Sequence, residues 1–301
     1  MKSGLLRGPR YVLWPHDDSF PVNLRMIPKP PKCLYVIGNP AALQPGLAVI
    51  GARKATPYGL TCARRFARIA SEKGVCIISG GARGCDSEAH RAAINAGGPT
   101  VVFLGGGCDC LYPPEHFGLF QTVIDSGGAV VSERAWDFKP KPYTFRERNR
   151  LIAGLAEAVL IVEAGMPSGT FSTADEALSA GKDVLVVPGA ITSPSSHGAN
   201  RLLYDGALPV VDDDTFEDVL FNALGALKRP DAVGVAGEPN DSLVAAVLAA
   251  PSSADDLLAL AVELYGQDDA WPRLMETLAE AEASRTIARQ PDGKWGPVVR
   301  P

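Results

Sequence analysis

Three glycine-rich segments of this sequence carry the residue types that bind phosphate. They are Gly51-Ala52-Arg53, the segment 79–84 (SGGARG) and Ser168-Gly169-Thr170, and each follows a short apolar run. A strand that leads through glycines into a helix brings bare backbone N–H groups close to an anion, and the helix dipole adds to the attraction. One such loop is equally well explained as a tight turn. Several together, with arginines among them, favour a ligand that carries phosphates.

A basic segment with interleaved aromatic residues gives a second indication of ligand chemistry. Residues 139–150 (KPKPYTFRERNR) hold five cations and one carboxylate, and Phe138, Tyr143 and Phe145 lie among them. Single-stranded nucleic acid is held by this combination, because guanidinium groups pair with phosphates and rings stack on bases. The alternative is an ordinary solvated face.

The apolar runs predict the elements that position these residues. They are nearly continuous in Val, Ile and Leu, as parallel strands buried on both faces are, and they cover 46–53, 75–81, 99–107, 129–133, 158–164, 183–189 and 208–211. Between the first two, residues 57–74 have helical spacing, with Pro57 suited to the first turn and Gly74 to the stop. The repeated unit predicts an α/β fold with a doubly wound, mostly parallel sheet, whose ligands bind at the carboxyl ends of the strands.

The chain divides into four predicted parts. Residues 1–45 are a proline-rich lead-in, 46–224 form the sheet domain, and 225–240 form a linker. Residues 241–301 contain three short helical patterns and then Asp292-Gly293, a favourable hairpin turn, so we expect a small winged-helix-like domain. This last part has five cations and ten anions, which should repel DNA, so we interpret it as a protein-contact module.

The composition excludes several classes of protein. The chain has 301 residues, 46% of them hydrophobic, and a net charge of −5, which does not suit a disordered chain. No apolar run reaches the roughly 18 residues of a membrane span, no secretory signal precedes the first strand, and the six scattered cysteines suit a reduced, cytoplasmic protein. The acidity argues against a nucleic-acid ligand, but it belongs to residues 241–301. Residues 1–240 hold 24 cations and 24 anions.

The motifs resemble those of the DprA/Smf family of DNA-processing proteins. The similarity runs through 21–39, 50-IGARKATPYG-59, 79–116 (from SGGARG), 132–133, 145–164 (from FRERNR), 168-SGTFSTADEALSAGKDVLVVPG-189 and 198–207. The resemblance implies an extended Rossmann-like fold and no enzymatic activity. It also implies sequence-independent binding of single-stranded DNA by a homodimer that protects incoming strands and loads RecA recombinase in natural transformation. The implied DNA-binding residues are Arg53, Ser79, Gly80, Gly81, Arg83, Lys141, Phe145, Arg146, Arg148, Asn149, Arg150, Ser168, Gly169 and Thr170.

A few residues could indicate a metal site or an enzyme rather than a DNA-binding protein. Asp86 and His90 share a helix face and could suggest metal or acid–base work, but we expect Asp86 to cap the helix and His90 to bond to the backbone nearby. We expect no metal site, since Cys108 and Cys110 are too close for structural zinc, and no cofactor. The fold also resembles that of nucleotide phosphoribohydrolases, but Thr173 stands where their catalytic carboxylate is expected, and Glu176 lies elsewhere. A third alternative is a winged-helix transcriptional regulator.

Overall fold

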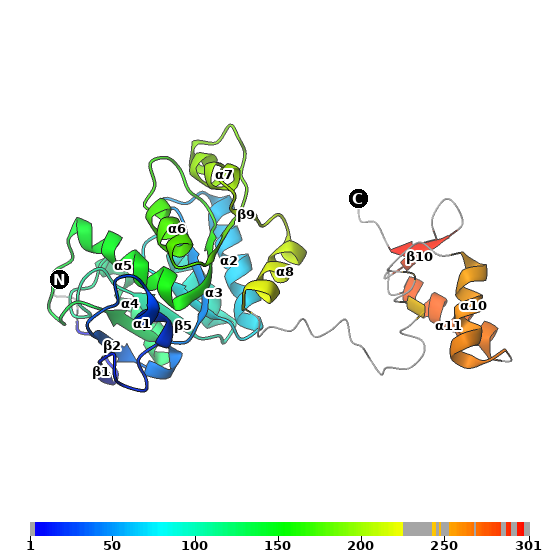
Figure 1. Ribbon diagram of the computed structural model, residues 1–301, viewed down its shortest axis with the longest axis horizontal. Helices are drawn as coiled ribbons and strands as arrows, with labels where there is room; N and C mark the ends of the chain where they lie inside the picture. Colours follow the sequence, from blue (N-terminus) through cyan, green and yellow to red (C-terminus); the bar gives the residue numbers. More distant parts are fainter. Residues whose placement is uncertain are drawn as a thin grey trace. The chain divides into compact units, whose positions relative to one another are not determined.

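The computed structural model describes residues 4–224, 243–244, 247, 253–267, 269–283, 287–289 and 294–297. It divides into two compact units, residues 1–227 and 228–301, each of which is considered by itself (Figure 1). No helix in the described ranges is both long enough and apolar enough to cross a membrane.

The first unit is built on a nine-stranded sheet with the order β1-β2-β6-β5-β4-β3-β7-β8-β9. The strands from β3 to β9 are parallel to one another, whereas β2 is antiparallel to both β1 and β6. Their bounds are β1 Arg10–Leu13, β2 Leu34–Gly38, β3 Gly46–Ile50, β4 Cys76–Ser79, β5 Thr100–Phe103, β6 Ala129–Ser132, β7 Ala156–Ile161, β8 Asp183–Val186 and β9 Leu208–Pro209. All seven predicted runs contain a strand, and the α/β, largely parallel sheet is confirmed.

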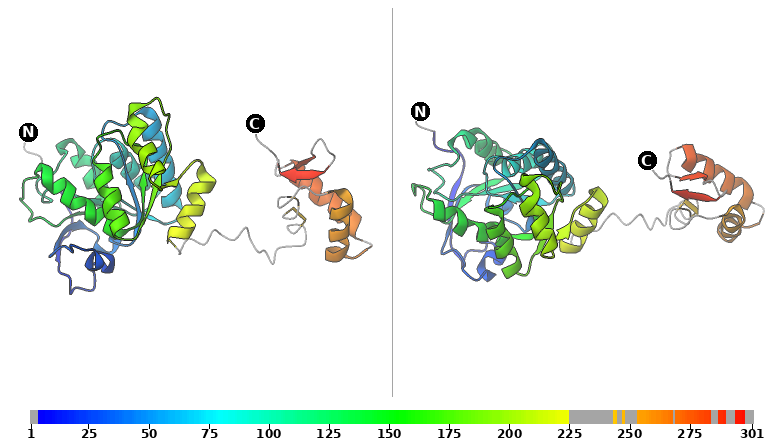
Figure 2. Two further views of the ribbon diagram at one scale, coloured as in Figure 1. Left: turned by 45° about the horizontal axis from the view of Figure 1, so that its top comes forward. Right: turned by 90° about the horizontal axis from the view of Figure 1, so that it is seen from above.

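Helices cover both faces of this sheet (Figure 2). On one face α1, α5, α6 and α7 pack over Ala48 and Ile50, while α2, α3 and α8 pack over Leu47 and Val49 on the other, where α4 covers the neighbouring strands. Successive residues of one strand are thus buried in opposite directions, which is why the strands carry no polar alternation. The helices are α1 Val22–Met26, α2 Pro57–Glu72, α3 Cys85–Asn95, α4 Phe117–Asp125, α5 Pro142–Leu155, α6 Thr170–Ser179, α7 His197–Tyr204 and α8 Asp213–Leu224.

The helix predicted at 57–74 shows how local sequence sets these elements. Thr56 is the N-cap of α2, with its hydroxyl accepting a hydrogen bond from Gly59 N at 3.3 Å, and Pro57 occupies the first turn. The helix ends at Glu72, and Gly74 has a φ of +78°, a left-handed conformation that favours glycine. The predicted start and stop are both confirmed.

The proline-rich segment before residue 46 is not a separate lead-in. It supplies β1 and β2, which extend the sheet beyond β6, and Leu24 and Leu34 lie in the core that α5 also covers. The expected start of the sheet at residue 46 is therefore wrong. The prediction missed β1 because this edge strand has only one fully buried residue, Leu13, and because prolines flank both short strands.

The second unit has its own apolar core, which includes Leu257, Leu274 and Ile287. Its described elements are α10 (Ala254–Tyr265), α11 (Ala270–Ala283) and an antiparallel pair, β10 (Ile287–Arg289) and β11 (Trp295–Pro297). Ser253 caps α10, accepting from Asp256 N at 3.2 Å. Asp292-Gly293, the linker 225–240 and most of the first predicted helix lie outside the described residues. The winged-helix assignment stays a prediction.

Candidate functional site

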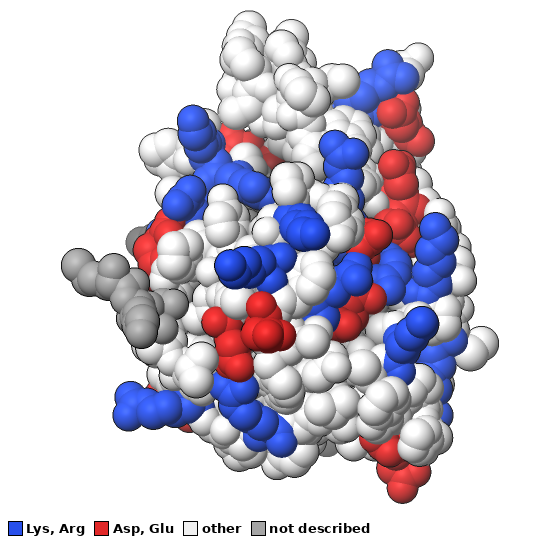
Figure 3. Space-filling view, turned by 90° about the vertical axis from the view of Figure 1, so that its left-hand side faces the viewer, with Lys and Arg blue, Asp and Glu red and all other residues white. Residues whose placement is uncertain are grey.

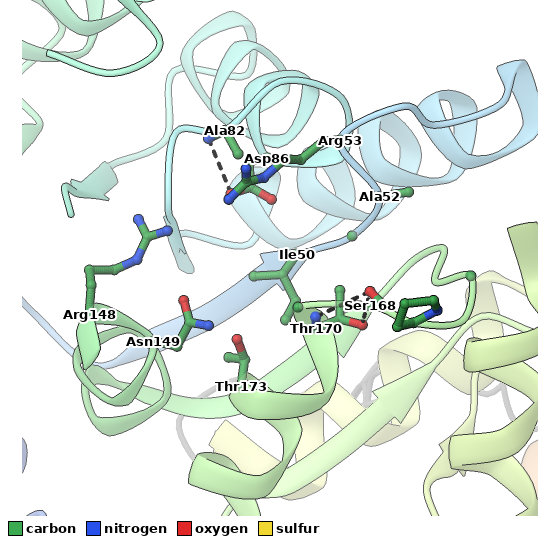
Figure 4. A pocket seen from close by; sticks show the side chains of 14 residues that line it. Ile50, Ala52, Arg53, Ala82, Asp86, Arg148, Asn149, Ser168, Thr170 and Thr173 are labelled. Carbon is green, nitrogen blue, oxygen red and sulfur yellow. Dashed lines mark hydrogen bonds between the residues drawn. The ribbon is translucent and has the colours of Figure 1, made fainter. Parts of the chain in front are cut away.

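A pocket of about 480 Å³ lies at the carboxyl ends of β3, β4 and β7, in the middle of the sheet. After β3 the chain builds the sheet in one direction through β4, β5 and β6, and then returns to the other side of β3 with β7. Ligands of doubly wound sheets bind at such a reversal, because the loops after the two central strands diverge there. The lining residues are Ile50, Gly51, Ala52, Arg53, Ala82, Asp86, Arg148, Asn149, Gly165, Pro167, Ser168, Gly169, Thr170 and Thr173 (Figure 4).

Three exposed cations form what we call the rim: Arg53 in the loop after β3, and Lys141 and Arg146 at the start of α5. Arg53 lies over the Phe145 ring at 5.6 Å, and Lys141 lies over Phe138 at 5.9 Å. Within the described part of the chain, none of the three has a carboxylate within ion-pair distance, although Arg134 and Arg150 close by are paired. Their charges are available to a ligand.

The aromatic part of the rim is only partly predictable from the sequence. Phe145 is partly exposed, and its ring centroid lies 5.3 Å from that of Tyr112, which is itself exposed. Arg53, Tyr112, Phe145 and Arg148 also line a smaller hollow beside the main pocket. Tyr112 has no basic residue next to it in the sequence, so no local signal marks it. The long loop between β5 and α4 brings it to the site.

We call Asp86, Arg148 and the backbone of residues 80–82 the floor. The Asp86 carboxylate accepts hydrogen bonds from Gly80 N at 3.2 Å and from Ala82 N at 3.3 Å. Arg148 donates from Nη1 to the carbonyl oxygens of Gly80, at 2.8 Å, and of Phe103. Both side chains are buried, at 6% and 5% exposure. Two amides expected to cap a phosphate are thus already bonded to a carboxylate of the chain.

Burial and mutual attraction act against each other in this pair. Burial raises the pKa of Asp86, whereas the charge of Arg148 and the N–H groups of the loop oppose that rise. Burial lowers the pKa of Arg148 to about 10, and the Asp86 carboxylate opposes that shift. The Coulomb attraction between the two groups thus opposes the effect of burial on each of them.

The glycine at position 80 is required by this arrangement. A Cβ atom there would lie on the guanidinium group of Arg148, which packs flat against the backbone. Gly81 has a φ of +65°, so the next position is also one that favours glycine. Two glycines predicted as a phosphate cradle therefore make room for an arginine and a turn.

The third side of the pocket is the start of α6. Ser168 Oγ lies 2.8 Å from Thr170 Oγ1 and accepts a hydrogen bond from Thr170 N at 3.2 Å. Asn149 donates from Nδ2 to Ser172 Oγ at 2.8 Å, which joins α5 to α6. Gly169, at the N-cap, is exposed and has open space where a side chain would be. Four predicted residues, Asn149, Ser168, Gly169 and Thr170, thus line the pocket as a group.

The remaining predicted residues do not line the main pocket. Ser79 is buried and donates to Val49 O at 2.7 Å, so its hydroxyl serves the sheet. Arg83 is exposed but paired with Glu115. Arg150 pairs with Glu133 at 2.7 Å. Figure 3 shows the face of the unit on which α5 lies, where several Lys and Arg side chains gather near the centre and Asp and Glu side chains adjoin many of them.

The residues considered for metal or acid–base work are bonded into the interior. His90 is buried and its Nδ1 lies 2.8 Å from the Thr100 hydroxyl, which donates to Ile77 O at 2.7 Å, so Nδ1 is the donor. Burial lowers the pKa of His90 to about 3, so the ring is neutral. Its partner is therefore a hydroxyl rather than the backbone, and Asp86 bonds to the loop before α3 rather than capping the helix. The described residues contain no group of three potential metal-binding side chains.

Two carboxylates near the strand ends, Glu163 after β7 and Glu176 on α6, do not line the main pocket. Glu163, 2% exposed, accepts from Thr56 N at 2.8 Å and from the Thr56 hydroxyl at 2.9 Å, so both of its oxygens hold the start of α2. Glu176 is on α6 but does not line the pocket, whereas Thr173 does. The pocket's own carboxylate is Asp86, for which the sequence predicts only a capping role.

Comparison with known proteins places the chain in a family. The model of the DNA recombination-mediator protein A family matches residues 11–220. Protein Smf of Escherichia coli is 33% identical over 291 residues, which cover 96% of this chain and 78% of that protein. DNA processing protein A of Streptococcus pneumoniae has a solved structure with a TM-score of 0.65 and 32% identity, covering 70% of this chain and 74% of that one.

A second solved structure, DNA processing protein A from Helicobacter pylori, has a TM-score of 0.65 and 29% identity, and covers 75% of this chain and 99% of that one. The family match extends over both the rim and the floor of the pocket. It also begins within β1, ahead of the predicted start of the sheet. The chain therefore belongs to the DNA recombination-mediator protein A family.

Proposed function

We propose that the sheet domain binds single-stranded DNA without sequence preference, with the sugar–phosphate backbone along the rim and a nucleotide in the pocket. The observation that carries this is Arg53, an exposed cation that lines the pocket at the reversal of strand order, together with the exposed cations Lys141 and Arg146 at the start of α5, a helix that also supplies Arg148 and Asn149 to the pocket lining. None of the three has a carboxylate partner among the described residues, which suits a polyanion. The Helicobacter pylori relative is described as having a unique single-stranded DNA binding mode.

The aromatic residues of the rim support a single strand rather than a duplex. Phe145 and Tyr112 are partly exposed beside Arg53, so an unstacked base can reach a ring while its phosphate meets the guanidinium. Bases within a duplex present their edges, not their faces. Every base has a face to stack, so contacts of this kind do not select a sequence.

Binding of fluorescent oligonucleotides by polarisation tests this proposal. The double variant Arg53→Ala/Lys141→Ala should weaken binding of a thymidine oligomer by at least about tenfold, and the slope of log affinity against log salt should fall by about one for each cation removed from a phosphate. The matched control is Arg68→Ala/Arg201→Ala, which removes two cations that are paired within α2 and α7. Unchanged binding by the folded rim variant, or equal losses in the control, would contradict the assignment.

The cellular role follows as a further part of the proposal. We infer that the chain acts in the cytoplasm as a homodimer without enzymatic activity, protects incoming strands and loads RecA recombinase onto them in natural transformation or recombination. Membership of a recombination-mediator family supports this role. Stimulation of RecA strand exchange on DNA covered by a single-strand-binding protein tests loading, and light scattering tests the dimer. A monomer, or no stimulation, would count against the respective part.

A further inference from the structure

The floor of the pocket differs from a phosphate site in one respect: its anion is part of the chain. The glycine loop after β4 directs Gly80 N and Ala82 N toward one point, and the oxygen at that point is Asp86 Oδ2. Cys85 N, in the first turn of α3, donates to Ala52 O at 3.3 Å. Three of the backbone donors that could hold a phosphate at this loop are therefore occupied by the chain itself.

The positive charge at the floor is also engaged by the chain. Arg148 is buried, and its charge and the Asp86 carboxylate attract each other across the floor. Its Nη1 donates to two carbonyl oxygens, whereas its Nε has no hydrogen-bond partner among the described residues. A second anion placed here would compete with Asp86 for the same cation and meet its negative charge in a poorly hydrated site.

We propose that Asp86 is a specificity-determining residue that keeps phosphate out of the floor, so that the pocket accepts an uncharged part of a nucleotide, its base or sugar, and phosphates stay on the rim. This inference rests on the proposed function and names its substrate class. A DNA strand can place an uncharged base or sugar in the pocket and keep its phosphates on the rim, since its diester charges lie outside its bases. Free pyrophosphate, or the charged end of a nucleoside triphosphate, would bring concentrated negative charge into the pocket.

The decisive variant is Asp86→Asn, which keeps an oxygen for the two loop amides and removes the charge that neutralises Arg148. Inorganic pyrophosphate is the probe, and thermal unfolding of the full-length chain is the readout, so the result does not depend on DNA binding. Pyrophosphate at millimolar concentration should leave the wild-type melting temperature unchanged and raise that of Asp86→Asn, with a gain in affinity of at least about tenfold.

The matched control is Asp205→Asn, which changes the net charge equally at an exposed position paired with Arg201 on α7. It should gain no pyrophosphate affinity. Equal stabilisation of the wild type and Asp86→Asn, or an equal gain in both variants, would overturn the proposal. Pyrophosphate that binds neither the wild type nor a folded Asp86→Asn would also overturn it, since removing the carboxylate would then have opened no anion site.

A competition experiment on the wild type keeps the proposal falsifiable if Asp86→Asn does not fold. Thymidine, which is uncharged, should displace a thymidine oligomer at lower concentration than pyrophosphate does. The reverse order would overturn the inference while leaving single-stranded DNA binding intact. Failure of the wild type to bind the oligomer would instead contradict the proposed function, and the pyrophosphate measurement would still decide on Asp86.

Discussion

The rim and the floor of the pocket contain the same kinds of residue in opposite states. Arg53 on the rim is exposed and has no carboxylate partner among the described residues, whereas Arg148 on the floor is buried and balanced by Asp86. Both arginines belong to motifs that predict phosphate contacts. The difference leads us to expect that an arginine beside a glycine loop contacts a ligand only if the fold leaves its charge without a partner.

The largest effect is expected from replacing Arg148, the arginine of the floor. Arg148→Met removes the hydrogen bonds to the Gly80 and Phe103 carbonyl groups and the positive charge that favours the buried Asp86 carboxylate, so the free energy of unfolding should fall by about 3 kcal/mol. Urea unfolding followed by circular dichroism measures this. The double variant Asp86→Asn/Arg148→Met should recover much of the loss. A fully stable Arg148→Met that merely binds DNA poorly would show that Arg148 belongs with the rim.

A second test uses pH and the other buried group behind the floor, His90. Its pKa in the folded state is about 3, below the ordinary value of 6.5, so the unfolded chain takes up the proton first. Stability is therefore complete above pH 6.5 and is lost as the pH falls toward 3, by roughly 4 kcal/mol from this group. His90→Gln should flatten the profile in this range. An unchanged profile in His90→Gln would contradict the assignment of this pH dependence to His90.

A third test compares two exposed arginines near the pocket mouth. Arg53→Ala should weaken binding of single-stranded DNA by about tenfold, or about 1.4 kcal/mol, because a free charge is removed. Arg83→Ala should cost less than about 0.5 kcal/mol, because Arg83 is already paired with Glu115. Polarisation assays at two salt concentrations separate these effects. Equal losses would mean that pairing does not decide which cations bind.

The smallest effect is expected from the second unit. Residues 241–301 have a net charge of −5, and each unit has a core of its own. A chain that ends at residue 227 should fold and bind single-stranded DNA within about twofold of the full chain, since the rim is complete without the acidic part. Loss of binding on truncation would require the second unit to contribute to the interface.

Much of the fold follows from local patterns. Each of the seven apolar runs coincides with a strand, and α2 begins and ends as Pro57 and Gly74 indicate. The strand β1 escapes prediction because it is a short edge strand with one fully buried residue. The strand β2 is as apolar as the predicted runs, but it lies within a proline-rich segment, and that composition favours an extended lead-in.

The candidate site is also predicted only in part, because local sequence indicates which loops meet but not every residue that they bring together. The loops after β3 and β7 and the start of α5 do meet at one pocket, as the rule for parallel sheets requires. Tyr112 escapes prediction, and the expectation that Asp86 caps its helix is wrong. Tyr112 reaches the rim on the long loop between β5 and α4. The Asp86 carboxylate accepts hydrogen bonds from the glycine loop that precedes its helix.

Periodicity and glycine loops are properties of the chain itself, and they are enough to predict the α/β class and the edge of the sheet at which the pocket lies, while the quoted motifs carry the resemblance to the family. Which charges remain available is settled only in the folded molecule. Net charge and spacing are properties of the chain, but pairing depends on which residues distant in sequence come within a few ångströms. Here that proximity separates Arg53, which is exposed and has no carboxylate partner among the described residues, from Arg148, which is buried, bonded to backbone carbonyl groups and attracted by Asp86.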